Sequence, residues 1–92
     1  MISLDQEKEI ALAWSKNRPL RLFYSCYIMS ESVFIYRHDT FNEDPLLVKI
    51  NAKGIFEKSK KFLPKDQKFL GVKIKQIIKI LRPNSVDFIL GD

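Results

Sequence analysis

Two consecutive segments with alternating apolar side chains constrain most strongly what this chain can fold into. From Leu20 to Met29, every second side chain belongs to a mostly apolar face, and several of the side chains between them are also large. A period of two over this length predicts a β-strand, here one with both faces largely covered. Ser30–Ser32 is a short turn, and Val33–Arg37 is predicted to return as the partner strand of a β-hairpin.

Five aromatic side chains fall on this predicted hairpin, and aromatic pairs across strands stabilise a sheet. Covering both faces of such a ribbon takes more protein than a chain of 92 residues readily supplies, and exposed aromatic patches are typical of protein interfaces. The hairpin is therefore a candidate partner-binding surface of an inhibitor, adaptor or homodimer, formed by Phe23, Tyr24, Tyr27, Phe34 and Tyr36.

The N-terminal segment is predicted to form an amphipathic helix from Ser3 to about Lys16. Its apolar residues recur with the period of a helix, and Ser3 and Gln6 have the spacing of a capping box. Arg18–Pro19 then ends the helix, because proline lacks the amide hydrogen that a continuing helix needs. Trp14 lies on the apolar side of this helix, and we expect it in the core.

Residues 46–63 are predicted to add a strand and a second helix. Leu46–Ile50 is mostly apolar and follows a polar, acidic loop, which is typical of a third strand. Ala52–Leu63 has apolar residues at helical spacing, with Asn51 as the capping residue and Pro64 as the terminator. The competing interpretation is a hairpin that turns at residues 53–54.

The segment Val72–Leu81 fits two patterns. As a strand it has one apolar face opposite lysines, and as a helix it has an apolar stripe from which two residues stray. Its five β-branched residues favour a strand. Arg82–Ser85 is then a turn, and Val86–Leu90 is a last strand that closes a second hairpin.

These elements predict an α+β fold: one small two-layer domain over residues 1–92, with a mainly antiparallel sheet and the helices on one face. The predicted order is helix, strand, strand, strand, helix, strand, strand. The glycines and prolines stand singly between patterned segments, which is typical of turns within one domain.

The charge is distributed unevenly along the chain. Residues 1–46 carry five basic and seven acidic side chains, a net charge of −2, whereas residues 47–92 carry eleven basic and four acidic side chains, a net charge of +7. Clustered lysines release condensed counterions when they meet phosphates, so the second half is suited to a nucleic-acid backbone. Our leading hypothesis is a non-catalytic protein that binds such a backbone through Lys53, Lys58, Lys60, Lys61, Lys73, Lys75, Lys79 and Arg82.

The same lysines also fit other roles. Ten of the eleven basic residues are lysine, a strongly hydrated point charge without the planar fork of arginine, which favours a solvated and solubilising surface. Lysines on an edge strand also prevent edge-to-edge association. An acidic protein or an anionic membrane surface would be alternative partners.

Sequence motifs for metal or nucleotide chemistry are not found. A structural zinc site needs about four Cys or His ligands, and the chain has one of each, Cys26 and His38. No glycine-rich phosphate-binding motif occurs, so we expect no cofactor. His38–Asp39 is the one place where an imidazole could act as acid or base near neutral pH, which makes a metal-independent endoribonuclease the third hypothesis.

The N-terminus and the hydropathy pattern predict a cytoplasmic protein. No apolar run approaches the roughly 20 residues that a membrane-spanning helix needs. The first residues are acidic where a secretory signal would be basic and then apolar, so we expect an intracellular chain complete from Met1. With a single cysteine, Cys26, no intrachain disulfide forms, and we expect that side chain to act as a small buried hydrophobe.

Overall fold

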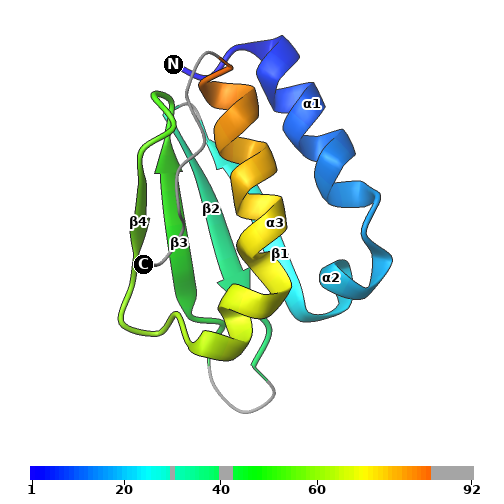
Figure 1. Ribbon diagram of the computed structural model, residues 1–92, viewed down its shortest axis with the longest axis vertical. Coiled ribbons are helices and arrows are strands. Elements are labelled where there is room, and N and C mark those ends of the chain that lie inside the picture. Colours follow the sequence, from blue (N-terminus) through cyan, green and yellow to red (C-terminus); the bar gives the residue numbers. More distant parts are fainter. Residues whose placement is uncertain (30, 40–42, 84–92) are drawn as a thin grey trace.

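The computed structural model describes residues 1–29, 31–39 and 43–83, which fold into one α+β domain of two layers. A four-stranded antiparallel sheet in the order β1-β2-β3-β4 forms one layer, and helices α1 and α3 lie side by side over one of its faces (Figure 1). The predicted fold class, the antiparallel sheet and the helices on one face are confirmed. The elements are α1 (Leu4–Ser15), α2 (Arg18–Phe23), β1 (Tyr24–Met29), β2 (Ser32–Arg37), β3 (Leu46–Asn51), β4 (Phe56–Lys58) and α3 (Pro64–Leu81).

Helix α1 begins as its sequence predicts. The Ser3 hydroxyl accepts a hydrogen bond from the Gln6 amide at 3.1 Å, and the Gln6 side chain accepts one from the Ser3 amide at 2.9 Å. This capping box satisfies two amides that a helix start leaves without partners. Ile10 and Trp14 of α1 are buried, which confirms the core position expected for Trp14.

The predicted strand from Leu20 is four residues too long at its start. Arg18–Phe23 forms the short helix α2, and β1 begins only at Tyr24. Asn17 caps α2 by accepting a hydrogen bond from the Leu20 amide at 3.0 Å, and Pro19 stands in the first turn, where its fixed φ suits a helix. Local capping therefore overrides the alternating pattern at this end.

The hairpin of β1 and β2 is confirmed. Tyr27 pairs with Phe34 in this hairpin, and β2 continues antiparallel to β3 with a register shift between Ile35 and Tyr36. The third predicted strand is also confirmed, as β3.

The helix predicted for Ala52–Leu63 is wrong. Asn51 does not cap a helix: its side-chain oxygen accepts hydrogen bonds from the amides of Lys53 at 2.9 Å and Ile55 at 3.1 Å, which closes a tight turn. Gly54 adopts a φ of 80° in this turn, a conformation that favours glycine. The chain then returns as the edge strand β4, so the hairpin at residues 53–54 is the structure that forms.

The strand predicted for Val72–Leu81 is also wrong, because these residues form the second half of helix α3. The stripe Leu70, Ile74, Ile77, Ile78 and Leu81 is buried, whereas Val72 is 74% exposed. Burying the whole stripe stabilises the helix more than the preference of the individual β-branched residues for strands opposes it. The last predicted strand, residues 86–90, lies outside the described residues.

The core lies between the sheet and the two long helices. Among the described residues, no helix combines the length and the apolar character needed to cross a membrane. The fully buried aliphatic side chains are Ile10, Leu20, Val33, Ile35, Leu47, Val48, Ile50, Leu70, Ile74, Ile77 and Ile78.

Candidate nucleic-acid interface

The outward side of α3 is basic along its whole length. Residues whose spacing places them opposite the buried stripe are all exposed, and four of them are lysines. We call these lysines the α3 ridge: Lys65, Lys68, Lys75 and Lys79. Two exposed apolar side chains, Phe69 and Val72, lie among them. Sequence analysis missed Lys65, Lys68 and Phe69, because the segment before residue 72 was assigned to no element, although the spacing of three and four residues was already present.

The one acidic residue of α3, Asp66, does not weaken this positive surface because it is fully buried. Its carboxylate accepts hydrogen bonds from the Arg37 guanidinium at 2.7 Å, the Tyr24 hydroxyl at 2.8 Å and the Leu63 amide at 2.9 Å. Arg37 thus neutralises the Asp66 charge. The three donors together replace the water that this buried carboxylate has lost.

The cluster around Asp66 also changes the acidity of its partners. Burial raises the pKa of the Tyr24 hydroxyl above its usual range, and Asp66 adds to this shift. Burial by itself would lower the pKa of Arg37, but hydrogen bonds and charges from Asp39 and Asp66 raise it above its ordinary value. Tyr24 therefore stays neutral and Arg37 stays charged, and the cluster joins β1, β2 and the start of α3.

Lys73, which was predicted to bind nucleic acid, points into the protein and is only 9% exposed. Its ammonium group donates a hydrogen bond to the Ala13 carbonyl at 2.6 Å, near the end of α1. A cation is favourable there, because the last carbonyls of a helix lack partners and carry partial negative charge. Burial lowers the pKa of Lys73, and the nearby Lys16 lowers it further. Lys73 therefore joins α1 to α3 and is not part of the exposed basic surface.

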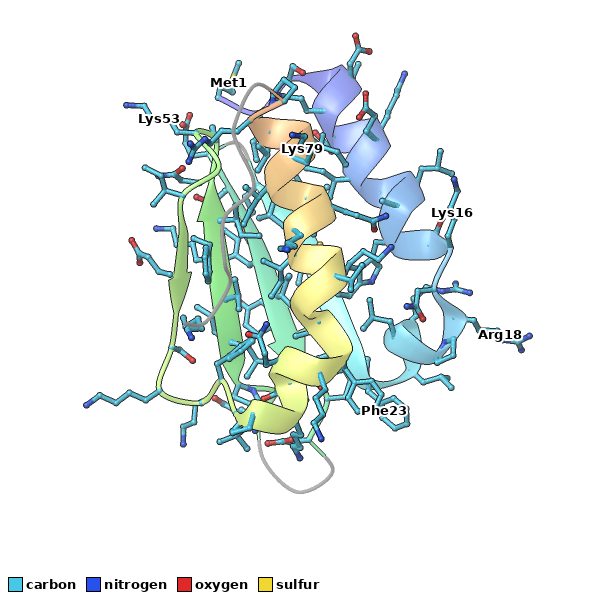
Figure 2. The ribbon with its side chains drawn as sticks, viewed as in Figure 1. Met1, Lys16, Arg18, Phe23, Lys53 and Lys79 are labelled. Carbon is cyan, nitrogen blue, oxygen red and sulfur yellow. The ribbon has the colours of Figure 1, made fainter. Side chains whose placement is uncertain are left out.

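A second group of predicted lysines lies along the edge of the sheet. We call these residues the β4 row: Lys53, Lys58, Lys60 and Lys61, all of them exposed. The row extends from the β3–β4 turn, where Lys53 stands, to the loop that leads into α3 (Figure 2). The Lys58 ammonium lies 5.6 Å from the centre of the Phe62 ring, which orients that side chain.

The segment that carries the β4 row contacts the end of α3 and is linked through Arg37 to its start. A Cβ atom placed on Gly54 would lie 2.6 Å from the Arg82 side chain, so the β3–β4 turn contacts the end of α3. At the other end, the Lys61 carbonyl accepts a hydrogen bond from Arg37 at 3.2 Å, and Arg37 also binds Asp66 in the first turn of α3. The segment that carries the β4 row thus lies beside α3 at both ends of this helix.

The five aromatic residues predicted to form a partner-binding surface do not lie together. Tyr24 is buried on the helix side of the sheet. Phe23 lies at the end of α2, with its ring 6.2 Å from that of Phe69. Only Tyr27, Phe34 and Tyr36 share the sheet face that points away from the helices.

His38 lies just after β2, at a small pocket. Its Nδ1 atom is 3.0 Å from the Leu22 carbonyl oxygen, so Nδ1 donates this hydrogen bond, and Nε2 forms a hydrogen bond with the Ser25 hydroxyl. His38 lines a pocket of about 180 Å³ whose other walls include Lys65 and Phe69 of α3. Asp39 does not orient the imidazole, because its carboxylate binds Arg37.

The chemistry of the remaining titratable groups is limited. Burial raises the pKa of the Cys26 thiol to about 12, so this side chain is a neutral thiol near pH 7. Within the described residues, no group of three or more His, Cys, Asp or Glu side chains is arranged to hold a metal ion.

No family model, curated protein or solved structure matches the chain.

Proposed function

We propose that this protein binds the phosphate backbone of a nucleic acid, with little sequence preference, through the α3 ridge and the β4 row. One observation carries the proposal: the exposed side of α3 presents four lysines, while the carboxylate of the same helix is buried against Arg37. A helix that only needed solubility could keep exposed acidic residues as well, as α1 does with Glu7 and Glu9.

The dimensions of the ridge suit a polyphosphate. Lys65 and Lys79 are 14 residues apart, which corresponds to about 21 Å along a helix at about 1.5 Å per residue. This length spans roughly six nucleotides of a duplex strand at about 3.4 Å each. Because lysines are point charges without a fixed fork, they position a backbone and do not read base edges.

Salt dependence tests this function directly. Fluorescence anisotropy with a labelled DNA duplex and a labelled single-stranded RNA, each at several salt concentrations, gives the slope of log K against log salt. If the eight lysines of the α3 ridge and the β4 row each neutralise one phosphate, we expect a slope of about −7.2 on duplex DNA. Absence of binding at low salt would overturn the proposal and leave the lysines as a solubilising surface.

Paired variants separate a localised site from net charge. Lys68→Glu with Lys75→Glu should reduce the magnitude of the slope by about 1.8, because two contacts are lost. Lys8→Glu with Arg21→Glu changes the net charge equally at exposed positions on α1 and α2, and should leave the slope nearly unchanged. Equal losses in both double variants would contradict a localised interface.

Two further measurements test the other hypotheses. Shortened RNA after incubation, abolished by His38→Ala, would replace backbone binding with cleavage at the His38 pocket. A stable dimer in sedimentation experiments would favour the interaction module. A cytoplasmic location is part of the present proposal.

A further inference from the structure

A second site lies on the sheet face that points away from the helices. A shallow pocket of about 330 Å³ is lined there by Tyr27 and Met29 of β1, Tyr36 of β2 and Asp44, which precedes β3. Tyr27 and Tyr36 belong to the same sheet face because Tyr27 pairs with Phe34, two residues before Tyr36. The α3 ridge belongs to the helix layer and therefore lies on the other side of the sheet. The pocket contains none of the ridge residues.

The two tyrosine rings form a corner in this pocket. Their centres are 5.6 Å apart and their planes make an angle of 77°. Tyr27 is 54% exposed, so part of its ring is open to a ligand. The face of an aromatic ring carries negative potential and attracts cations, most strongly where water is partly displaced.

Asp44 adds a formal negative charge to the aromatic corner. Its carboxylate is held by a hydrogen bond from the Asp39 amide at 3.0 Å, which engages Oδ1. Among the described residues that line the pocket, none is basic, and no ion pair of Asp44 is formed within the described part of the chain. The pocket thus combines aromatic ring faces with one carboxylate, and both features favour a cation.

The same sheet face already holds one cation against an aromatic ring. The Lys49 ammonium lies 5.9 Å from the centre of the Phe34 ring, directly across from it in the β2–β3 pair. A free ammonium group such as that of lysine keeps a tight hydration shell, which a single carboxylate replaces poorly. An alkylated ammonium group loses less hydration and brings methyl groups to the walls formed by the rings and Met29.

We propose that the pocket of Tyr27, Met29, Tyr36 and Asp44 binds a methylated ammonium group. This chemistry occurs in choline-type small molecules and in the side chain of trimethyllysine. The proposal is independent of nucleic-acid binding, since it uses none of the ridge or row lysines.

An NMR titration of the isotope-labelled full chain tests the proposal. Choline, tetramethylammonium and N-acetyl-trimethyllysine amide are the probes, with unmethylated lysine amide and 3,3-dimethylbutanol, the uncharged analogue of choline, as controls. We expect shifts at Tyr27, Tyr36 and Asp44 with a Kd on the order of 1 mM, and binding of the controls weaker by about tenfold. Equal binding of 3,3-dimethylbutanol, or no binding of any methylated probe, would overturn the proposal. A preference for choline or for trimethyllysine identifies which source the pocket serves.

Matched variants connect the binding to the named groups. Tyr27→Leu should weaken binding of the preferred probe by about tenfold, whereas Tyr27→Phe keeps the ring and should change it by less than about threefold. Asp44→Asn keeps an oxygen for the Asp39 amide and removes the charge in an exposed loop, so it should fold normally and bind several times more weakly. Unchanged affinity in both Tyr27→Leu and Asp44→Asn would exclude this pocket as the site.

Discussion

Asp66 is a single residue on which the junction of three segments depends. Its carboxylate is the shared acceptor for Tyr24 of β1, Arg37 of β2 and the Leu63 amide before α3. A fully buried charge of this kind is tolerated because its partners replace the water it has lost. Removing the carboxylate would leave both the Arg37 charge and the Tyr24 hydroxyl with fewer partners inside the protein.

We therefore expect Asp66→Ala to lower the free energy of unfolding by about 3–5 kcal/mol, as for other buried pairs from which one partner is removed. Tyr24→Phe is the matched control, because it removes one hydrogen bond and keeps the ring, and should cost about 1 kcal/mol. Urea unfolding followed by circular dichroism measures both. Similar small losses in the two variants would mean that Arg37 finds another partner when Asp66 is absent.

Helix α3 shows how one element can contain lysines with opposite roles. Lys75 faces outward in the α3 ridge, whereas Lys73, two residues earlier, is buried against the end of α1. Two residues correspond to about 200° around a helix, so neighbouring lysines in the sequence point to opposite sides. The same turn of α3 therefore contributes both to packing and to the exposed positive surface.

Replacement of each lysine by methionine, which keeps an unbranched apolar stem, separates these roles. Lys73→Met should lower the free energy of unfolding by about 1 kcal/mol, since the lost hydrogen bond to Ala13 is partly offset by the easier burial of an uncharged group. It should leave the salt slope of nucleic-acid binding unchanged. Lys75→Met should do the reverse, with stability within about 0.5 kcal/mol and a slope smaller by about 0.9.

Urea unfolding and the anisotropy titration are the two measurements for this pair. A reduced slope in Lys73→Met at full stability would show that the Lys73 ammonium leaves Ala13 to contact phosphate.

At the scale of the whole molecule, the two proposed surfaces lie on opposite sides of the sheet. The α3 ridge is carried by the helix layer, and the pocket of Tyr27, Met29, Tyr36 and Asp44 lies on the sheet face that points away from the helices. A helix with its side chains is about 10 Å across, which already exceeds the Debye length of about 8 Å at physiological salt. The charges of one surface therefore contribute little to binding at the other.

This separation predicts independent binding. Lys68→Glu with Lys75→Glu should leave the affinity for the preferred methylated probe within about twofold, and Tyr27→Leu should leave the salt slope on duplex DNA unchanged. Both expectations are tested by measuring each set of variants in the NMR titration with the methylated probe and in the anisotropy titration with duplex DNA. Loss of nucleic-acid binding in Tyr27→Leu at normal stability would instead indicate one ligand that spans both faces.

The sequence alone was sufficient to predict the features that depend on residues close together in the chain. The capping box of Ser3 and Gln6, the hairpin of β1 and β2 and the uneven charge all depend on residues close in sequence. The α+β class followed from these elements, because a hairpin with an apolar face needs a covering layer.

Only the tertiary structure decided the second half and the site. Val72–Leu81 has patterns for both a strand and a helix, and the apolar face of the sheet selected the helix by burying one stripe of it. The same packing directed Lys73 inward and the ridge lysines outward, and it brought Asp66 to Arg37 from 29 residues away. Residue types and spacing thus determined which charges and aromatic rings the protein has. Which of them meet water depends on contacts between distant segments, and local preference does not contain that information.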